Sequence, residues 1–80
     1  MVTHGEIIQD QRQAKGFVLR LVEAELDGAS DPAYVGALQA AHRRLKKEPL
    51  HRFTMMAPKA MEVMAKRAIF KARRKAGVEL

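Results

Sequence analysis

The stretch at residues 31–49, DPAYVGALQAAHRRLKKEP, predicts one complete helix with its own start and stop signals. Asp31 can cap free backbone N–H groups, and Pro32 suits the first helical position because its fixed φ is helical and its missing N–H needs no partner there. Pro49 ends the segment because proline cannot continue a helix. We therefore expect a helix over residues 32–47. Its buried stripe comprises Tyr34, Ala37, Leu38, Ala41 and Leu45.

Upstream of this segment, apolar residues at helical spacing predict a first helix over about residues 4–27. Thr3 and Glu6 have the spacing of a capping box, in which each side chain bonds the backbone N–H of the other residue. Gly28 suits the position just after a helix. The apolar stripe comprises Ile7, Ala14, Val18, Leu21 and Val22, with Ile8 and Phe17 beside it.

Downstream, the pattern predicts a third helix over residues 58–76, with Pro58 at its start and Thr54 as an outer capping candidate. Its core face is made of small and flexible side chains, which let another helix approach closely. These are Met61, Met64, Ala65, Ala68, Ile69, Ala72 and Ala76. The connection at 48–57 is apolar enough to fold back onto the core, and it is too long for the short turn of a helix-turn-helix DNA reader. Its apolar residues are Leu50, Phe53, Met55 and Met56.

These three segments, with no alternating strand pattern between them, predict an all-α fold in a single domain over residues 1–80, a small three-helix bundle. So short a chain buries only about 60% of its unfolded surface. It has no cysteine, so neither a disulfide nor a thiolate metal site can stabilise it. We therefore expect homodimerisation to complete the core. Glu6 and Asp10 interrupt any secretory signal, and no apolar run is long enough for a membrane span, which predicts a cytoplasmic protein.

The charge of the chain is distributed unevenly between its two halves. Residues 41–80 hold twelve of the fifteen Lys and Arg residues but only three of the nine acids, giving a net charge of +9, whereas residues 1–40 have a net charge of −3. Basic side chains near a helix C-terminus complement the helix dipole, which accounts for part of the cluster at the end of the second helix. The remainder predicts a polyanionic or acidic partner for the C-terminal half.

The side of the third helix opposite its core face carries two apolar residues among cations. Val63 and Phe70 are seven residues apart and so align along the axis. One interpretation is a nucleic-acid face on which Phe70 stacks or wedges. The other is packing against the bundle or a second protomer, with the cations extending around the apolar pair. Packing is the commoner role of apolar residues at helical spacing, and we favour it. The surrounding cations are Lys59, Lys66, Arg67, Arg73 and Arg74.

Catalysis and cofactors are not expected from this sequence. His4, His42 and His51 lack the close spacing of metal ligands, and there is no Gly-rich phosphate loop or nucleophile elbow. Ser30 has no plausible base and is better explained as a turn or capping residue. The acids of the first helix have no matching Glu-x-x-His pair on another helix, so a carboxylate metal site is not expected either. We expect no small-molecule substrate.

We favour a non-enzymatic nucleic-acid-binding protein with an accessory or regulatory role, whose partner is DNA rather than RNA and whose contacts are mainly nonspecific. The alternative is an adaptor or inhibitor whose basic helical face docks on an acidic partner protein. Binding of a basic helix to anionic lipid is a third option, which the Ala-rich core face disfavours. The predicted nucleic-acid site comprises Arg43, Arg44, Lys46, Lys47, Arg52, Lys66, Arg67, Phe70, Lys71, Arg73, Arg74 and Lys75.

Overall fold

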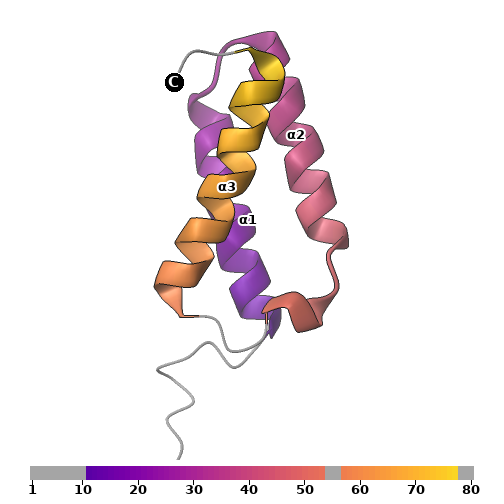
Figure 1. Ribbon diagram of the computed structural model, residues 1–80, viewed down its shortest axis with the longest axis vertical. Coiled ribbons are helices and arrows are strands. Elements are labelled where there is room, and N and C mark those ends of the chain that lie inside the picture. Colours follow the sequence, from indigo (N-terminus) through magenta and orange to yellow (C-terminus); the bar gives the residue numbers. More distant parts are fainter. Residues whose placement is uncertain (1–10, 54–56, 78–80) are drawn as a thin grey trace, which may run out of the picture.

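The computed structural model describes residues 11–53 and 57–77, which form an all-α, three-helix arrangement (Figure 1). The helices are α1 (Gln11–Gly28), α2 (Pro32–Lys47) and α3 (Pro58–Ala76), and a short 3-10 helix, η1 (Leu50–Phe53), joins the last two. Each of the three helices contacts the other two, and η1 contacts α1. The predicted fold class is therefore confirmed. Homodimerisation stays a prediction.

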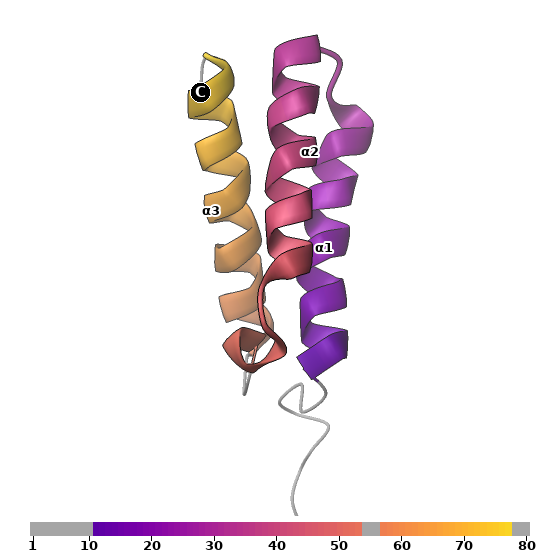
Figure 2. The same cartoon turned by 90° about the vertical axis from the view of Figure 1, so that its right-hand side faces the viewer.

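Consecutive helices run in opposite directions along the bundle, as Figure 1 and Figure 2 show. The chain ascends through α1, descends through α2, turns in η1 and ascends again through α3. As a result, α2 ends at the same end of the bundle at which α3 begins. The antiparallel course of α2 and α3 places their basic last turns at opposite ends of the bundle.

The ends of α2 follow from the local signals in its sequence. Asp31 is extended, and its carboxylate accepts a hydrogen bond from the backbone N–H of Tyr34 at 3.0 Å. Pro32 occupies the first turn, and the chain leaves the helix at Glu48 before Pro49. The structure thus has α2 and α3 over the expected residues 32–47 and 58–76.

The other helix ends differ in part from expectation. Helix α1 includes Gly28 and so ends one residue later than expected; of the glycines in the described ranges, Gly77 alone has a positive φ, of 75°. Gly77 donates its N–H to the last carbonyls of α3, as a left-handed cap does. The predicted capping residues Thr3, Glu6 and Thr54 lie outside the described residues. So do four predicted apolar residues, Ile7, Ile8, Met55 and Met56.

The core consists of one face from each element. Its buried residues are Ala14, Val18 and Val22 of α1, Tyr34 and Leu38 of α2, Phe53 of η1, and Met61, Ala65 and Ala72 of α3. The core stripe predicted for α3 is confirmed, because its other four members pack against this cluster. The described part of the connection that forms η1 does fold back onto the bundle, since Phe53 has no exposed surface.

Packing of Val63 and Phe70 within the bundle, which we favoured from the sequence, is wrong. The two side chains are 44% and 46% exposed. They lie on the side of α3 opposite Met61, Ala65 and Ala72, and a bundle of three helices covers only one side of each. Packing of the pair against a second protomer stays a prediction.

Candidate nucleic-acid interface and the adjacent groove

The exposed side of α3 combines basic and apolar side chains, and we call it the outer face of α3. Its members are all exposed to solvent: Lys59, Val63, Lys66, Arg67, Phe70 and Arg74. The guanidinium carbon of Arg74 lies 5.8 Å from the centroid of the Phe70 ring, within the range of a cation–π contact. In the described part of the chain, no acidic side chain pairs with the cations of this face. They remain available to an external anion.

The predicted cations of α2 lie at the opposite end of the bundle from the last turn of α3 (Figure 1). Four of them are exposed in the last turns of α2: Arg43, Arg44, Lys46 and Lys47. Lys71, Arg74 and Lys75 are exposed near the end of α3. The antiparallel course of the two helices therefore spreads the predicted site along the bundle instead of gathering it into one compact patch.

Arg73 is partly exposed and forms hydrogen bonds to side chains of two other helices. Its Nε donates to the Tyr34 hydroxyl at 3.0 Å, and another guanidinium nitrogen donates to Glu25 Oε2 at 3.0 Å. The Tyr34 hydroxyl donates to the same carboxylate oxygen at 2.6 Å. This cluster joins α1, α2 and α3, so Arg73 contributes to the fold and has less of its hydrogen-bonding capacity left for phosphate.

The same cluster shifts the protonation equilibria of its members. The hydrogen bond from Tyr34, followed by that from Arg73, lowers the pKa of Glu25 below its ordinary value of 4.5. Burial, followed by the hydrogen bond to Glu25, raises the pKa of Tyr34. The hydrogen bonds to Tyr34 and Glu25 raise the pKa of Arg73. Glu25 and Arg73 are therefore charged and Tyr34 is neutral at physiological pH.

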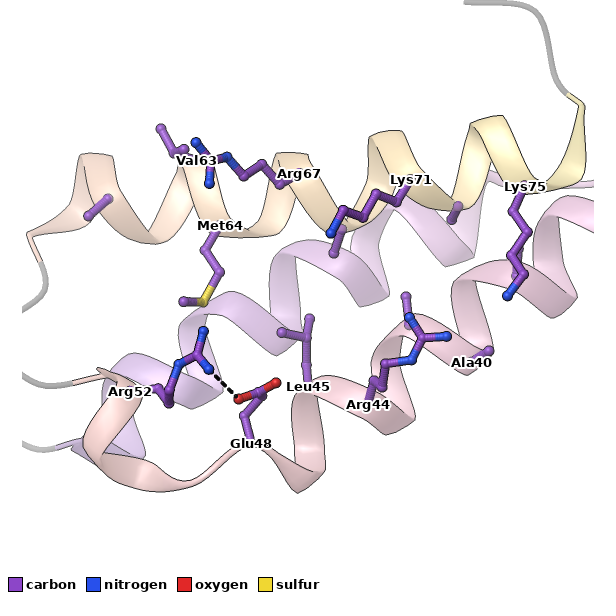
Figure 3. Close-up of a pocket in the computed structure, with 15 residues that line it drawn as sticks. Ala40, Arg44, Leu45, Glu48, Arg52, Val63, Met64, Arg67, Lys71 and Lys75 are labelled. Carbon is purple, nitrogen blue, oxygen red and sulfur yellow. Dashed lines mark ion pairs between the residues drawn. The ribbon is translucent and has the colours of Figure 1, made fainter.

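A groove of about 540 Å³ lies between α2 and α3, beside the outer face of α3 (Figure 3). Alanine side chains supply much of its floor, together with Leu45 of α2 and Met64 of α3. The alanines are Ala37, Ala40, Ala41, Ala60, Ala68 and Ala72. Because these side chains are so short, the two helices leave an open trough where larger residues would have filled the space.

The rim of this groove is basic. Lys71 and Lys75 extend from α3 toward α2, and Arg44 extends from α2 toward α3 (Figure 3). Arg52 is partly neutralised by Glu48, which lies 3.5 Å away and is the groove's one acidic residue. Together with Arg67, five of the twelve predicted site residues border the groove. These five line one groove along the bundle, although they come from three separate segments of the chain.

Lys15 of α1 is a structural cation that the sequence pattern did not single out. Its Nζ donates to the backbone carbonyls of Lys46 and, at 2.9 Å, Glu48, which lie at the C-terminal end of α2. The ammonium also lies 5.9 Å from the centroid of the Phe53 ring. Carbonyls at a helix C-terminus attract cations, so Lys15 joins α1, the end of α2 and η1.

The remaining chemistry-bearing residues are dispersed. His42 lies on α2 with its Nε2 2.8 Å from Glu23 Oε2 of α1, and His51 is exposed on η1. Within residues 11–53 and 57–77, no three His, Asp or Glu side chains gather closely enough to hold a metal ion. No helix in the described part of the chain is long and apolar enough to cross a membrane.

No protein-family model, curated protein or solved structure matches this chain.

Proposed function

We propose that this protein is a small, non-enzymatic nucleic-acid-binding protein with an accessory or regulatory role, which contacts phosphates through the outer face of α3 and neighbouring cations of α2. The exposure of Val63 and Phe70 among cations carries the proposal. An apolar pair that is about half exposed and lies outside the core cluster, surrounded by basic side chains, suits a ligand that is both anionic and able to stack.

The arrangement favours DNA over single-stranded RNA. Tyr34 and Phe53 are buried, and Phe70 is the one aromatic side chain exposed in the described ranges. A single exposed aromatic can wedge at a base step of a duplex, whereas single-stranded RNA is bound by several aromatics that stack successive bases. The spread of cations along α2 and α3 supplies phosphate contacts without reading base edges, so binding is mainly nonspecific.

A titration of fluorescein-labelled duplex DNA, followed by anisotropy at two salt concentrations, tests this proposal. Each phosphate that a basic side chain neutralises steepens the dependence of log K on log salt by about 0.9. We expect salt-steep binding to the duplex, weaker binding to single-stranded RNA, and little binding to a polyglutamate peptide. Absence of binding at low salt would refute the proposal.

Two variants that remove one charge each provide a matched comparison. Lys66 lies on the outer face of α3, and Arg20 is exposed on α1. Lys66→Gln should weaken duplex binding severalfold and reduce the salt slope by about 1, whereas Arg20→Gln should change neither. Equal losses in the two variants would mean that net charge alone drives association.

The second candidate function, docking on an acidic partner protein, has its own observation in its favour. The groove between α2 and α3 joins an apolar floor to a basic rim. The groove shares Val63 and Arg67 with the outer face of α3 and otherwise lies beside it, so the two functions use adjoining surfaces of the same molecule.

A further inference from the structure

The groove between α2 and α3 has the length and shape needed to bind a helix. On α3 it runs from Ala60 to Lys75, which corresponds to about 22 Å at the rise of an α-helix. Its floor of alanine methyls, Leu45 and Met64 lets another backbone approach closely. An occupying helix of about 15 residues would span it.

The charges at the rim specify the chemistry of that helix. Lys71 and Lys75 are one turn apart, and Arg44 faces them across the groove (Figure 3). Acidic residues four positions apart on the occupant would meet the two lysines, because such residues also lie one turn apart. A further acid on the opposite flank would meet Arg44. The apolar stripe between these acids would cover the floor.

We infer that this groove binds an acidic amphipathic helix of a partner protein, with the apolar stripe on the alanine floor and carboxylates along both rims. This inference rests on the second candidate function, docking on an acidic partner protein, and adds to it the binding surface and the helical form of the ligand; it does not depend on nucleic-acid binding. Removing the floor from water supplies the affinity, and the matching charges supply orientation and a faster encounter.

A nucleic acid fits the groove less well. Phosphates would satisfy the rim, but the floor carries no side-chain hydrogen-bond donor or acceptor for a base, and Phe70 does not line it. The alanine methyls would stay hydrated beneath a phosphate backbone. The outer face of α3, with its exposed aromatic, suits that ligand better.

A second copy of this chain also fits less well. The apolar stripe of its α1 is already buried in its own core, and its exposed Val63 and Phe70 are surrounded by cations. If α1 of the second copy entered the groove, it would bring no free apolar stripe. If α3 entered, it would bring its own cations against the basic rim. Like charges brought together at an interface oppose association.

The test is a titration of a labelled peptide of about 15 residues against the full chain, followed by fluorescence anisotropy. The peptide carries Leu and Ala along one helical stripe and Glu on both flanks. A second peptide has the same composition in scrambled order, and a third has Gln in place of Glu. The inference predicts saturable binding of the first peptide, and binding at least about tenfold weaker for the other two.

Matched protein variants locate the binding surface. Lys71 lines the groove and Lys66 lies on the outer face of α3, and both are exposed in the middle of that helix. Lys71→Glu should weaken peptide binding about tenfold or more, and Lys66→Glu should leave it within about twofold. Duplex DNA should respond to both substitutions, so failure of this inference is distinguishable from failure of the proposed function.

A substitution that fills the groove with a larger side chain tests the inference without changing the charge of the protein. Ala40 lines the groove outside the core cluster, and Ala33 is exposed on the same helix away from it. Ala40→Leu should weaken peptide binding about tenfold, and Ala33→Leu should not, with thermal melts confirming that both variants fold. Equal binding of the scrambled peptide, equal effects of Lys66→Glu and Lys71→Glu, or concentration-dependent dimerisation that Ala40→Leu abolishes would each overturn the inference.

Discussion

Glu25 accepts hydrogen bonds from Tyr34 and Arg73, so its charged form is favoured in the folded protein and its pKa is lowered. A carboxyl whose pKa is lower in the folded state stabilises that state above its unfolded pKa. This stabilisation is lost as the pH falls below 4.5 and through the folded pKa. Because the three side chains come from three helices, acid loosens the bundle at a contact that joins all of them.

Replacement of this carboxylate by an amide tests the cluster. Glu25→Gln keeps the shape of the side chain but removes its charge, and it should lower the free energy of unfolding by about 1 kcal/mol near neutral pH. Thermal melts at several pH values should show wild type and variant converging in acid. Glu62 is an exposed acid of α3, so Glu62→Gln serves as the control. A constant difference between Glu25→Gln and wild type at every pH would contradict the assigned role.

Lys15 offers a second test at the scale of a residue. Lys15→Met keeps the aliphatic part of the side chain but removes the ammonium that bonds the carbonyls of Lys46 and Glu48. We expect a loss of about 1 kcal/mol in the free energy of unfolding, measured by urea denaturation. Lys66→Met, on the exposed side of α3, should cost less than about 0.5 kcal/mol. Equal losses would show that the contact with the end of α2 is not stabilising.

Three glycines have open space for an added methyl group but differ in backbone conformation. Gly16 of α1 and Gly36 of α2 lie within helices, whereas Gly77 caps α3 with a φ of 75°, which an L side chain rarely adopts. Gly16→Ala and Gly36→Ala should each raise the free energy of unfolding by about 0.5–1 kcal/mol, because glycine weakens a helix interior. Gly77→Ala should lower it by about 1 kcal/mol. Thermal melts of the three variants check this, and stabilisation by Gly77→Ala would contradict the left-handed cap.

The helices themselves were predictable because their signals are local. Asp31, Pro32 and Pro49 mark the ends of α2, and apolar spacing identifies the core face of α3. The exposure of Val63 and Phe70 was weighed but not favoured from the sequence, since apolar periodicity does not tell how many neighbours cover a helix. An apolar pair at the centre of a ring of cations was the signal that could have favoured exposure.

Contacts between distant parts of the chain could not be predicted from the sequence for a related reason. Lys15 bonds carbonyls more than thirty positions away, and Glu25 meets Arg73 forty-eight positions away. No local pattern distinguishes such cations from those that face solvent. The basic character of the candidate site could therefore be predicted, whereas the engagement of Arg73 and the groove between α2 and α3 needed the three-dimensional arrangement.

In the folded molecule, the uneven distribution of charge along the chain becomes a difference in charge between two sides of the bundle. Helix α3 carries seven basic residues and one acid, whereas the described part of α1 carries three of each. Because the core face of every helix is already occupied, the basic surface of α2 and α3 is left for external ligands. We expect the side of the bundle formed by α2 and α3 to approach polyanions first, at rates that fall as salt rises.

The measurement that tests the central claim most directly is a paired assay of Phe70→Ala. Its thermal unfolding is compared with wild type, and its affinity for duplex DNA is measured by anisotropy in the same buffer. We predict a change of less than about 0.5 kcal/mol in the free energy of unfolding, together with a loss of about 1–3 kcal/mol in binding free energy. A loss of several kcal/mol of stability, or unchanged DNA affinity, would contradict the assignment of the outer face of α3 as a binding surface.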